Sequence, residues 1–307
     1  MNTSELIKCF KALSDKTRLR LFYLLREYEL NVNEIVLVVG MIQSGVSRHL
    51  KILLESGLLT ARKEGSFTYY SIAGNRIART LIEMIGQQRL DDTTFGEDAT
   101  AAAEMIHIRQ NRTKRFFKSV APKWDRLKKD VLGDFDLNGA LKKRIQSGKT
   151  ISDLGCGTGE LFECLSENHY KKLIGIDSST DMLDQARIRL ANKPRVELRL
   201  GEVEHLPMKN EEIDTAAMAM VLHHVSQPRL PIAEVFRVMK PGGSFILSDF
   251  QKHDNESIKA IIGGSWLGFE KKQIKRWLTE SGFTVKAVHS YSVNHNLTIN
   301  IFTAKKH

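Results

Sequence analysis

A glycine-rich turn is the feature that most constrains how the C-terminal half of this chain can fold. The apolar run 151–154 leads into Gly155, Gly157 and Gly159, and a helical pattern follows. Glycines at such a turn let the backbone approach a ligand at the N-terminus of the next helix. Because short apolar runs and helical patterns alternate from Thr150 onward, we expect a parallel α/β sheet.

The next apolar run ends in an acidic residue. Residues 173–176 precede Asp177, which stands 22 residues after Gly155. A carboxylate at this position can accept hydrogen bonds from both hydroxyls of a ribose. A dinucleotide enzyme could share this geometry, and the glycines alone would also fit a merely tight turn.

Three later segments decide between these alternatives. Residues 201–207 follow a third expected strand. The fourth strand begins with 213–220 and ends with 221–225, and residues 237–243 precede a fifth. Together with the glycine turn they resemble class I S-adenosylmethionine-dependent methyltransferases over about residues 110–305. The resemblance implies a Rossmann-like sheet with helices on both faces.

The same resemblance implies which residues bind the cofactor, S-adenosyl-L-methionine or S-adenosyl-L-homocysteine. It places Asp153 and 155–159 at the methionine and sugar end, and Asp177 at the ribose. Glu202 and Val203 take the adenine amino group and ring, and Glu202 stands where many relatives have Asp. The full expected set is Asp153, Gly155, Cys156, Gly157, Thr158, Gly159, Asp177, Ser178, Met182, Glu202, Val203 and Met220.

Histidines are the candidate catalytic residues. Methyl transfer is an in-line displacement in which the protein mainly positions the acceptor, so a base is optional. His223 and His224 stand at the end of the expected fourth strand, facing the cleft, and His253 follows the strand 244–249. One of the pair could instead pack, or orient the methionine carboxylate region.

Absent motifs narrow the acceptor. The chain has no N-P-P-Y stretch and no Pro-Cys nucleophile, which disfavours methylation of DNA bases. Arsenite methylation needs a set of thiolates, whereas Cys156 lies in the glycine turn and Cys164 only two helical turns on. The absence of these motifs, together with the lack of an evident catalytic base, favours sensing of the cofactor over catalysis.

The first 90 residues have a different pattern. Apolar residues recur at helical spacing over 6–13 and 19–25, and the apolar stretch 32–39 runs to Gly40 before Ser44 opens another helix. Helix, glycine-containing turn and second helix form a helix-turn-helix. Two strands around a Glu-Gly turn follow over 59–72 and form a wing.

The second helix of this motif presents polar side chains outward. Val46, Leu50, Leu53 and Leu54 share its inward face. Hydrogen-bonding and cationic side chains on the outward face and the wing are those that reach base edges and phosphates. The expected DNA contacts are Gln43, Ser44, Ser47, Arg48, His49, Lys51, Arg62 and Lys63. A winged helix used only for protein contacts or dimerisation is the alternative.

This segment resembles the ArsR/SmtB family of winged-helix repressors. The resemblance is carried by A-L-S-D-K-T-R-L-R-L at 12–21, S-R-H-L-K-I-L at 47–53 and E-S-G-L-L at 55–59. It implies a homodimer, paired through the first helix and the helix at 75–87, on a palindromic double-stranded operator. The chain has Asn where many metal sensors of the family have C-x-C, so we expect no metal site.

The net charge of +10 is unevenly distributed. Residues 1–90 have 13 Lys/Arg against 8 Asp/Glu, 91–106 have 5 acidic residues and no basic one, and 107–149 have 13 against 4. From residue 150 the count is 20 against 19. The surplus therefore lies where it would attract nucleic acid, although a solvated basic face would show the same counts.

These patterns predict a two-domain α/β protein. The winged helix occupies 1–90, a linker 91–106, and the methyltransferase-like domain 107–307 with a cap segment at 107–149. The cap contains F-F-x-x-V-A-P-x-W-D, which resembles the segment covering the substrate cleft in quinone- and biotin-pathway methyltransferases. No apolar run reaches the roughly 20 residues of a membrane span, so we expect a cytoplasmic protein without membrane contact.

The whole chain resembles fusions of an ArsR-type repressor with a methyltransferase domain, some of which respond to S-adenosylhomocysteine. Two functions follow from the resemblance. In the first, the protein is a repressor whose methyltransferase-like domain senses S-adenosylmethionine or S-adenosylhomocysteine. In the second, it is an active methyltransferase on a small metabolite, and its winged helix regulates its own operon.

Overall fold

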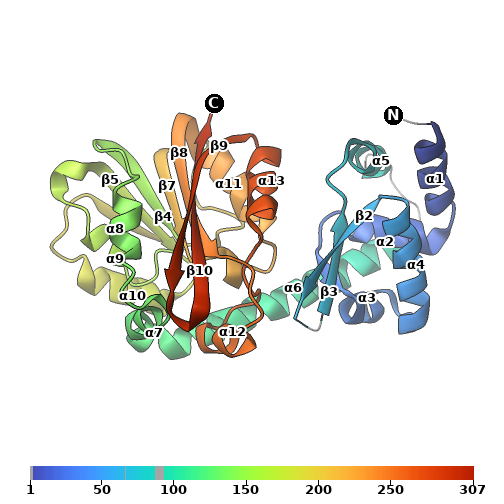
Figure 1. The fold of residues 1–307 in the computed structure, drawn as a ribbon, viewed down its shortest axis with the longest axis horizontal. Coiled ribbons are helices and arrows are strands. Elements are labelled where there is room, and N and C mark those ends of the chain that lie inside the picture. Colours follow the sequence, from blue (N-terminus) through green and yellow to red (C-terminus); the bar gives the residue numbers. More distant parts are fainter. Residues whose placement is uncertain (1–2, 66, 87–92) are drawn as a thin grey trace. The chain divides into compact units, whose positions relative to one another are not determined.

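The chain divides into two compact units, Met1–Arg109 and Gln110–His307 (Figure 1). The computed structural model describes residues 3–65, 67–86 and 93–307. We call the two parts the N-terminal unit and the C-terminal unit and describe each by itself.

The N-terminal unit is a winged helix-turn-helix. Leu21, Phe22, Ile35, Leu50 and Leu53 are fully buried and form the centre of its core. Its three-stranded sheet has the order β1-β3-β2, with β2 and β3 antiparallel. The elements are α1 (Thr3–Leu13), α2 (Lys16–Leu24), β1 (Leu30–Asn31), α3 (Val32–Val39), α4 (Gln43–Glu55), β2 (Leu59–Glu64), β3 (Phe67–Ile72) and α5 (Arg76–Gly86).

Local capping explains where these helices begin and end. Asp15 accepts a hydrogen bond from the backbone N–H of Arg18 at 2.9 Å and caps α2. A capping box between Asn31 and Glu34 starts α3, and Gly40 ends it at a φ of 68°. The glycine conformation turns the chain into α4, as the helix-turn-helix pattern requires.

Helix α6 (Thr93–Val120) begins in the N-terminal unit and ends in the C-terminal unit. It starts inside the segment 91–106 that the composition predicted as a linker, whose first two residues lie outside the described part. Tertiary contacts explain the helical conformation: Asp98 is buried against Arg20, and Phe95 packs edge-on against Tyr23 at 5.4 Å. Such contacts override a weak local preference for a turn.

The C-terminal unit is a seven-stranded sheet of order β6-β5-β4-β7-β8-β10-β9. All neighbours are parallel except β10, which is antiparallel to both β8 and β9. The sheet is therefore mixed, with β10 antiparallel to its neighbours, rather than wholly parallel as the alternating pattern predicted. The strands are β4 (Lys149–Leu154), β5 (Tyr170–Asp177), β6 (Val196–Leu200), β7 (Ile213–Ala219), β8 (Met239–Phe250), β9 (Phe283–Val293) and β10 (Leu297–Lys306).

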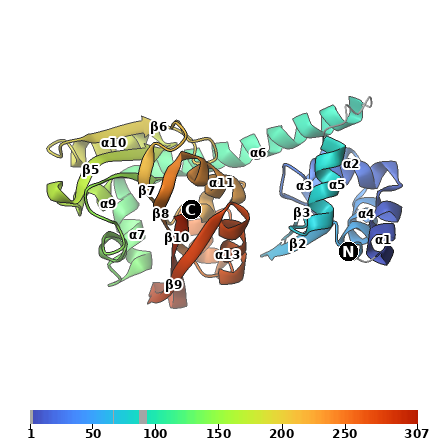
Figure 2. The same ribbon diagram turned by 90° about the horizontal axis from the view of Figure 1, so that it is seen from above.

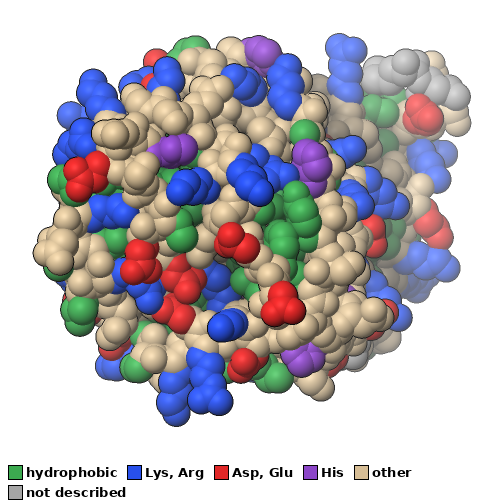
Figure 3. Space-filling view, turned by 60° about the vertical axis from the view of Figure 1, so that its left-hand side comes forward, with side chains coloured by type: hydrophobic (Ala, Val, Ile, Leu, Met, Phe, Trp, Pro, Cys, Tyr) green, Lys and Arg blue, Asp and Glu red, His purple; other side chains and the backbone are tan. Residues whose placement is uncertain are grey.

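Helices cover both faces of this sheet (Figure 2). A short 3-10 turn, Ala121–Lys123, joins α6 to the cap helix α7. The others are α7 (Trp124–Leu132), α8 (Leu137–Lys142), α9 (Glu160–Glu163), α10 (Thr180–Arg189), α11 (Arg229–Val238), α12 (Glu256–Ile262) and α13 (Lys271–Glu280). Basic and acidic side chains are interspersed on the face of this unit shown in Figure 3.

The fourth strand is shorter than the sequence predicted. Strand β7 ends at Ala219, and residues 222–224 form a 3-10 turn rather than the end of a strand. The prediction for 221–225 was wrong because Met220 adopts a φ of 60°, which turns the chain out of the sheet. Its backbone N–H donates to the carbonyl of Ser248 at 2.9 Å and fixes that turn.

Among the described residues, no single helix is both long enough and apolar enough to span a membrane. Helices α3 and α4 reach that length and hydropathy only when they are counted together, and the chain bends by 111° between them.

Candidate functional site

The glycine turn after β4 brings backbone to the edge of the sheet. Gly155 has a φ of 73°, and a Cβ there would lie 2.5 Å from a methyl of Val221. Gly159 has a φ of 83°, and its Cβ would lie 2.9 Å from Leu190. A side chain at either position would therefore clash as well as strain the backbone, so the tight turn depends on these glycines.

Asp177 holds this turn in place from the end of β5. One carboxylate oxygen accepts from the N–H of Gly157 at 2.8 Å and the other from the N–H of Ser179 at 2.9 Å. Burial raises the pKa of Asp177, and these backbone hydrogen bonds partly offset the effect. The acid predicted to bind ribose therefore also organises the loop around it.

Asp153 is a buried carboxylate beside the turn. It lies in β4 in register with Gly175 of β5 and Ala217 of β7, and it is 4% exposed. Burial raises the pKa of Asp153 to about 7; Lys128 opposes the shift, whereas Asp177 adds to it. A cationic ligand group at this point would restore the ionised form, so the site fits the ammonium and sulfonium groups of S-adenosylmethionine.

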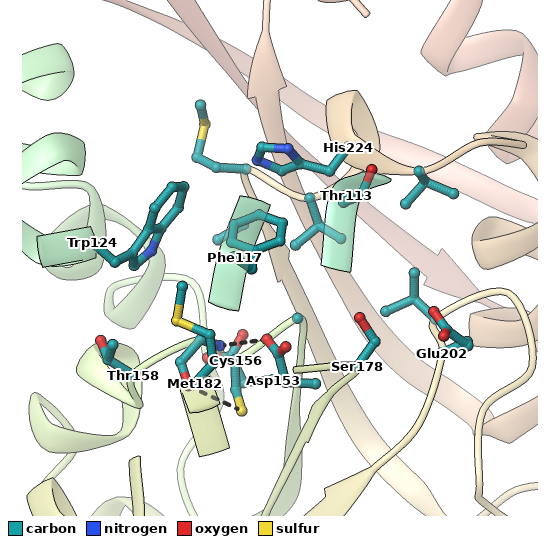
Figure 4. A pocket seen from close by; sticks show the side chains of 18 of the residues that line it. Thr113, Phe117, Trp124, Asp153, Cys156, Thr158, Ser178, Met182, Glu202 and His224 are labelled. Atoms are coloured by element: carbon teal, nitrogen blue, oxygen red, sulfur yellow. Dashed lines mark hydrogen bonds between the residues drawn. The ribbon is translucent and has the colours of Figure 1, made fainter. Parts of the chain in front are cut away.

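One large pocket collects the predicted cofactor residues (Figure 4). It encloses about 1020 Å³, including space open to solvent. Every residue of the expected cofactor set lines it except Gly159, which packs against α10. Burial raises the pKa of the Cys156 thiol well above its ordinary value, so this pocket residue is a neutral thiol.

Trp124 and Asp125 of the cap segment contact the glycine turn. The hydroxyl of Thr158 donates to Asp125 at 2.6 Å, and Arg189 also binds both of these residues. Trp124 lies over Gly157, where an added Cβ would be 3.7 Å from the indole nitrogen. The hydroxyl of Thr158, an expected cofactor residue, is thus already engaged by the cap.

Several pocket residues come from the end of α6 and were not predicted individually. They include Gln110, Thr113, Lys114 and Phe117. Lys114 forms an ion pair with Glu202, with 2.5 Å between Nζ and Oε1. The F-F-x-x-V-A-P-x-W-D pattern indicated that this segment covers a cleft, but it did not identify which of its side chains face the ligand.

The three candidate histidines have different surroundings. His224 lines the large pocket, whereas His223 lines a smaller apolar cavity and lies 2.8 Å from Asp249 through Nδ1. His253 lines neither cavity, and its Nδ1 accepts from the N–H of Asn255 at 3.1 Å. Of the three, the structure therefore brings only His224 to the large pocket that the expected cofactor residues line.

Within the described residues, no cluster of three or more His, Cys, Asp or Glu side chains is arranged to hold a metal ion.

Most of the predicted DNA contacts are accessible on the N-terminal unit. His49 is half-buried, 3.7 Å from Asp15, and Arg62 is 14% exposed between Glu29 and Glu64 at 3.1 and 2.9 Å. Arg62 is therefore already engaged within the unit, whereas Nδ1 of His49 is buried without a hydrogen-bond partner among the described residues. The exposed ones are Gln43, Ser44, Ser47, Arg48, Lys51 and Lys63.

Two family models match the chain. Residues 15–61 match the bacterial regulatory protein, arsR family, and residues 152–247 match a methyltransferase domain. The chain therefore joins an ArsR-family helix-turn-helix domain to a class I methyltransferase domain. This fold implies S-adenosylmethionine binding.

Curated relatives match parts of the chain. An uncharacterized 37.1 kDa protein in a transposon of Streptomyces fradiae is 40% identical over 33% of this chain and 30% of its own length. The demethylmenaquinone methyltransferase of Desulfitobacterium hafniense is 31% identical over 50% and 64%. An arsenite methyltransferase of Halobacterium salinarum is 28% identical over 44% and 37%. The matches thus span less than two thirds of each relative.

Solved structures share the fold of the C-terminal unit. The [4+2]-cyclase SpnF has a TM-score of 0.54 at 18% identity, covering 63% of this chain and 94% of its own. A putative methyltransferase from Haloferax volcanii, in complex with an activator, has a TM-score of 0.56 at 15% identity, covering 64% and 98%. Since one neighbour is named a cyclase, the fold alone does not define the reaction.

Proposed function

We propose that the protein is a DNA-binding transcriptional repressor whose methyltransferase-like domain binds S-adenosylmethionine or S-adenosylhomocysteine as its effector. The ion pair between Lys114 and Glu202 is the observation that supports this most directly. Glu202 is the carboxylate expected to accept from the adenine amino group. A bound nucleoside would therefore compete with Lys114 for the same oxygen atoms.

Lys114 belongs to the helix that both units share. Toward its beginning, α6 is held within the N-terminal unit by Asp98, whose Oδ1 lies 2.7 Å from Arg20. Farther along, Nε of Arg109 lies 2.9 Å from Glu34, which also caps α3 of the helix-turn-helix. Release of Lys114 by a ligand would thus act on a helix that contacts the DNA-binding motif.

A homodimer on a palindromic operator is part of the proposal. Apolar side chains are exposed on the two helices expected to pair: Ile7 and Phe10 on α1, and Met84 on α5, each about half exposed. Covering these side chains in a dimer would remove apolar surface from water. Two recognition helices would then face successive major-groove segments of the operator.

The test is a gel shift with the full-length protein on the DNA upstream of its own gene, with and without each cofactor form. We expect one form to change the DNA affinity by up to about fivefold, the lower end of the usual range of allosteric coupling, because release of a partly exposed ion pair supplies about 0–1 kcal/mol. Lys114→Met should reduce this ratio toward one. Affinity for the ligand itself should change less than about tenfold, because an ion pair this exposed contributes about 0–1 kcal/mol.

Lys118→Met is the matched control, since Lys118 is an exposed cation on the same helix that does not line the pocket. It should keep the full response to ligand. An equal loss of response in both variants would show that the charge of the helix, and not the contact with Glu202, matters.

The alternative function is methyl transfer to a small metabolite. It is supported by pocket residues beyond the expected cofactor set, among them Phe117, Trp124 and His224, which could surround an acceptor. Methylation of metabolite extracts by the purified protein, combined with no effect of either cofactor form on DNA affinity, would replace the sensor proposal with this one.

A further inference from the structure

His224 has a polar atom that the rest of the protein leaves unsatisfied. Its Nε2 is buried and has no hydrogen-bond partner among the residues the structure describes. The imidazole projects from the turn after β7 into the large pocket, toward Phe117 and Trp124 (Figure 4). A buried polar atom without a partner costs free energy, so a ligand that satisfied it would gain affinity.

The surroundings define the chemical state of this nitrogen. Nδ1 of His224 lies 3.3 Å from the carbonyl of Gly263, which can only accept a hydrogen bond. The proton is therefore on Nδ1, and Nε2 has a lone pair. Burial, with a smaller effect of His223, lowers the pKa of His224 well below its ordinary value, so the ring is neutral.

Aromatic rings enclose this end of the pocket. Phe117 meets His224 edge-on with ring centroids 4.8 Å apart, and Trp124 lies 6.1 Å from it. Phe117 and Trp124 are themselves 5.2 Å apart at 74°. Such a box favours a flat, uncharged ring, because edge-to-face contacts add to the burial of apolar surface.

A second cavity adjoins the box. Trp124 and Met220 line both cavities, and the smaller one encloses about 270 Å³. Most of its other side chains are apolar, including Val131, Leu132 and Phe250. Rotation of Trp124 or Met220 would therefore give an apolar ring additional space.

We propose that the pocket has a second subsite, beside the expected cofactor residues, for a small uncharged aromatic compound whose hydroxyl group donates to Nε2 of His224. Phe117 and Trp124 supply the apolar contacts, and His224 supplies the one directional contact, a hydrogen bond. Phe117, Trp124 and His224 lie outside the expected cofactor set, and under the alternative function they would surround a methyl acceptor. The subsite thus goes beyond the proposed function and predicts a second ligand.

Titration of the full-length protein with p-cresol and with toluene tests the subsite, because the two probes differ in the hydroxyl group. Calorimetry should show saturable binding of p-cresol at least fivefold tighter than that of toluene, since loss of one neutral hydrogen bond changes affinity by roughly this factor. In protein with 15N-labelled histidine, the Nε2 resonance of His224 should shift with p-cresol and not with toluene. Equal affinities, or an unchanged resonance, would overturn the proposal.

Two variants separate the contributions. His224→Phe should abolish the preference for p-cresol and retain toluene binding, whereas Trp124→Leu should weaken both probes. Binding of S-adenosylhomocysteine and the DNA response are measured in the same samples. If binding of S-adenosylhomocysteine and the DNA response are both lost while p-cresol still binds, only the sensor proposal is contradicted. If His224→Phe still prefers p-cresol to toluene, only the subsite proposal is contradicted.

Discussion

Asp153 is the residue whose protonation state ligand binding should change. Its folded-state pKa of about 7 lies above the ordinary value of 3.8, so the ligand-free fold loses stability as the pH rises from about 4 to 7. A cationic ligand favours the ionised carboxylate. Ligand binding below pH 7 must therefore release a proton.

We expect the affinity for S-adenosylmethionine to increase about tenfold from pH 6 to pH 8, as linkage to one carboxyl with this pKa requires. Calorimetry in two buffers of different ionisation enthalpy would count the released proton. Asp153→Asn should bind more weakly and show a nearly flat profile. A tenfold pH dependence that persists in this variant would assign the proton to another group.

The expected cofactor residues came from the motif spacing together with the family resemblance. The glycine turn and Asp177 are close in space because consecutive parallel strands end at the same edge of a sheet, and nearly the whole expected set lines one pocket. The histidines were harder to place. Met220 has a positive φ, which nothing in the local sequence indicates, and it sends His223 and His224 toward different cavities.

At the scale of elements, the recognition helix and the wing differ in the availability of their cations. Arg48 on α4 is exposed, whereas Arg62 on β2 lies between Glu29 and Glu64. Arg48→Met should weaken operator binding about 10–150-fold, because a charge-assisted contact to phosphate or base contributes about 1.5–3 kcal/mol. Fluorescence anisotropy with labelled operator DNA measures the change.

Arg62→Met should instead lower the thermal stability of the N-terminal unit, because it leaves two glutamates without their shared cation. Its operator affinity should stay within about threefold of the wild type under conditions where the unit is folded. A tenfold loss of affinity in this variant would mean that Arg62 exchanges its glutamates for a phosphate on binding.

Helix α6 shows what sequence reasoning missed at this scale. The acidic, glycine-containing segment at its start has the composition of a hinge, yet Asp98 is buried and pairs with Arg20 across 78 positions of sequence. Phe117 was missed for the same reason, because its position in the pocket depends on packing against distant residues such as His224. Contacts between residues far apart in the chain leave no signal in the local hydrophobic periodicity.

At the scale of the whole molecule, the prediction concerns assembly. Phe10→Glu should convert a dimer into a monomer and reduce affinity for a palindromic operator at least a hundredfold, because a buried charge opposes pairing and a single half-site binds weakly. Sedimentation equilibrium gives the oligomeric state. Ile188→Glu is the control, since Ile188 is 73% exposed on α10. A dimer that survives Phe10→Glu would move the interface elsewhere.

Because Arg62 of the wing is paired with Glu29 and Glu64, it adds nothing to the electrostatic attraction between the protein and the DNA phosphates. Excluding Arg62, the recognition helix and the wing present Arg48, Lys51 and Lys63, or about six cations in a dimer. Each phosphate neutralised releases about 0.9 counterion, so the logarithm of operator affinity should fall with the logarithm of salt at a slope of about −5. Counting Arg62 would give about −7. At a slope of about −5, operator affinity falls roughly a thousandfold between 50 and 200 mM salt, so phosphate contacts still supply a large share of the binding. Nonspecific DNA should nevertheless compete less strongly than it would if Arg62 were free to bind phosphate.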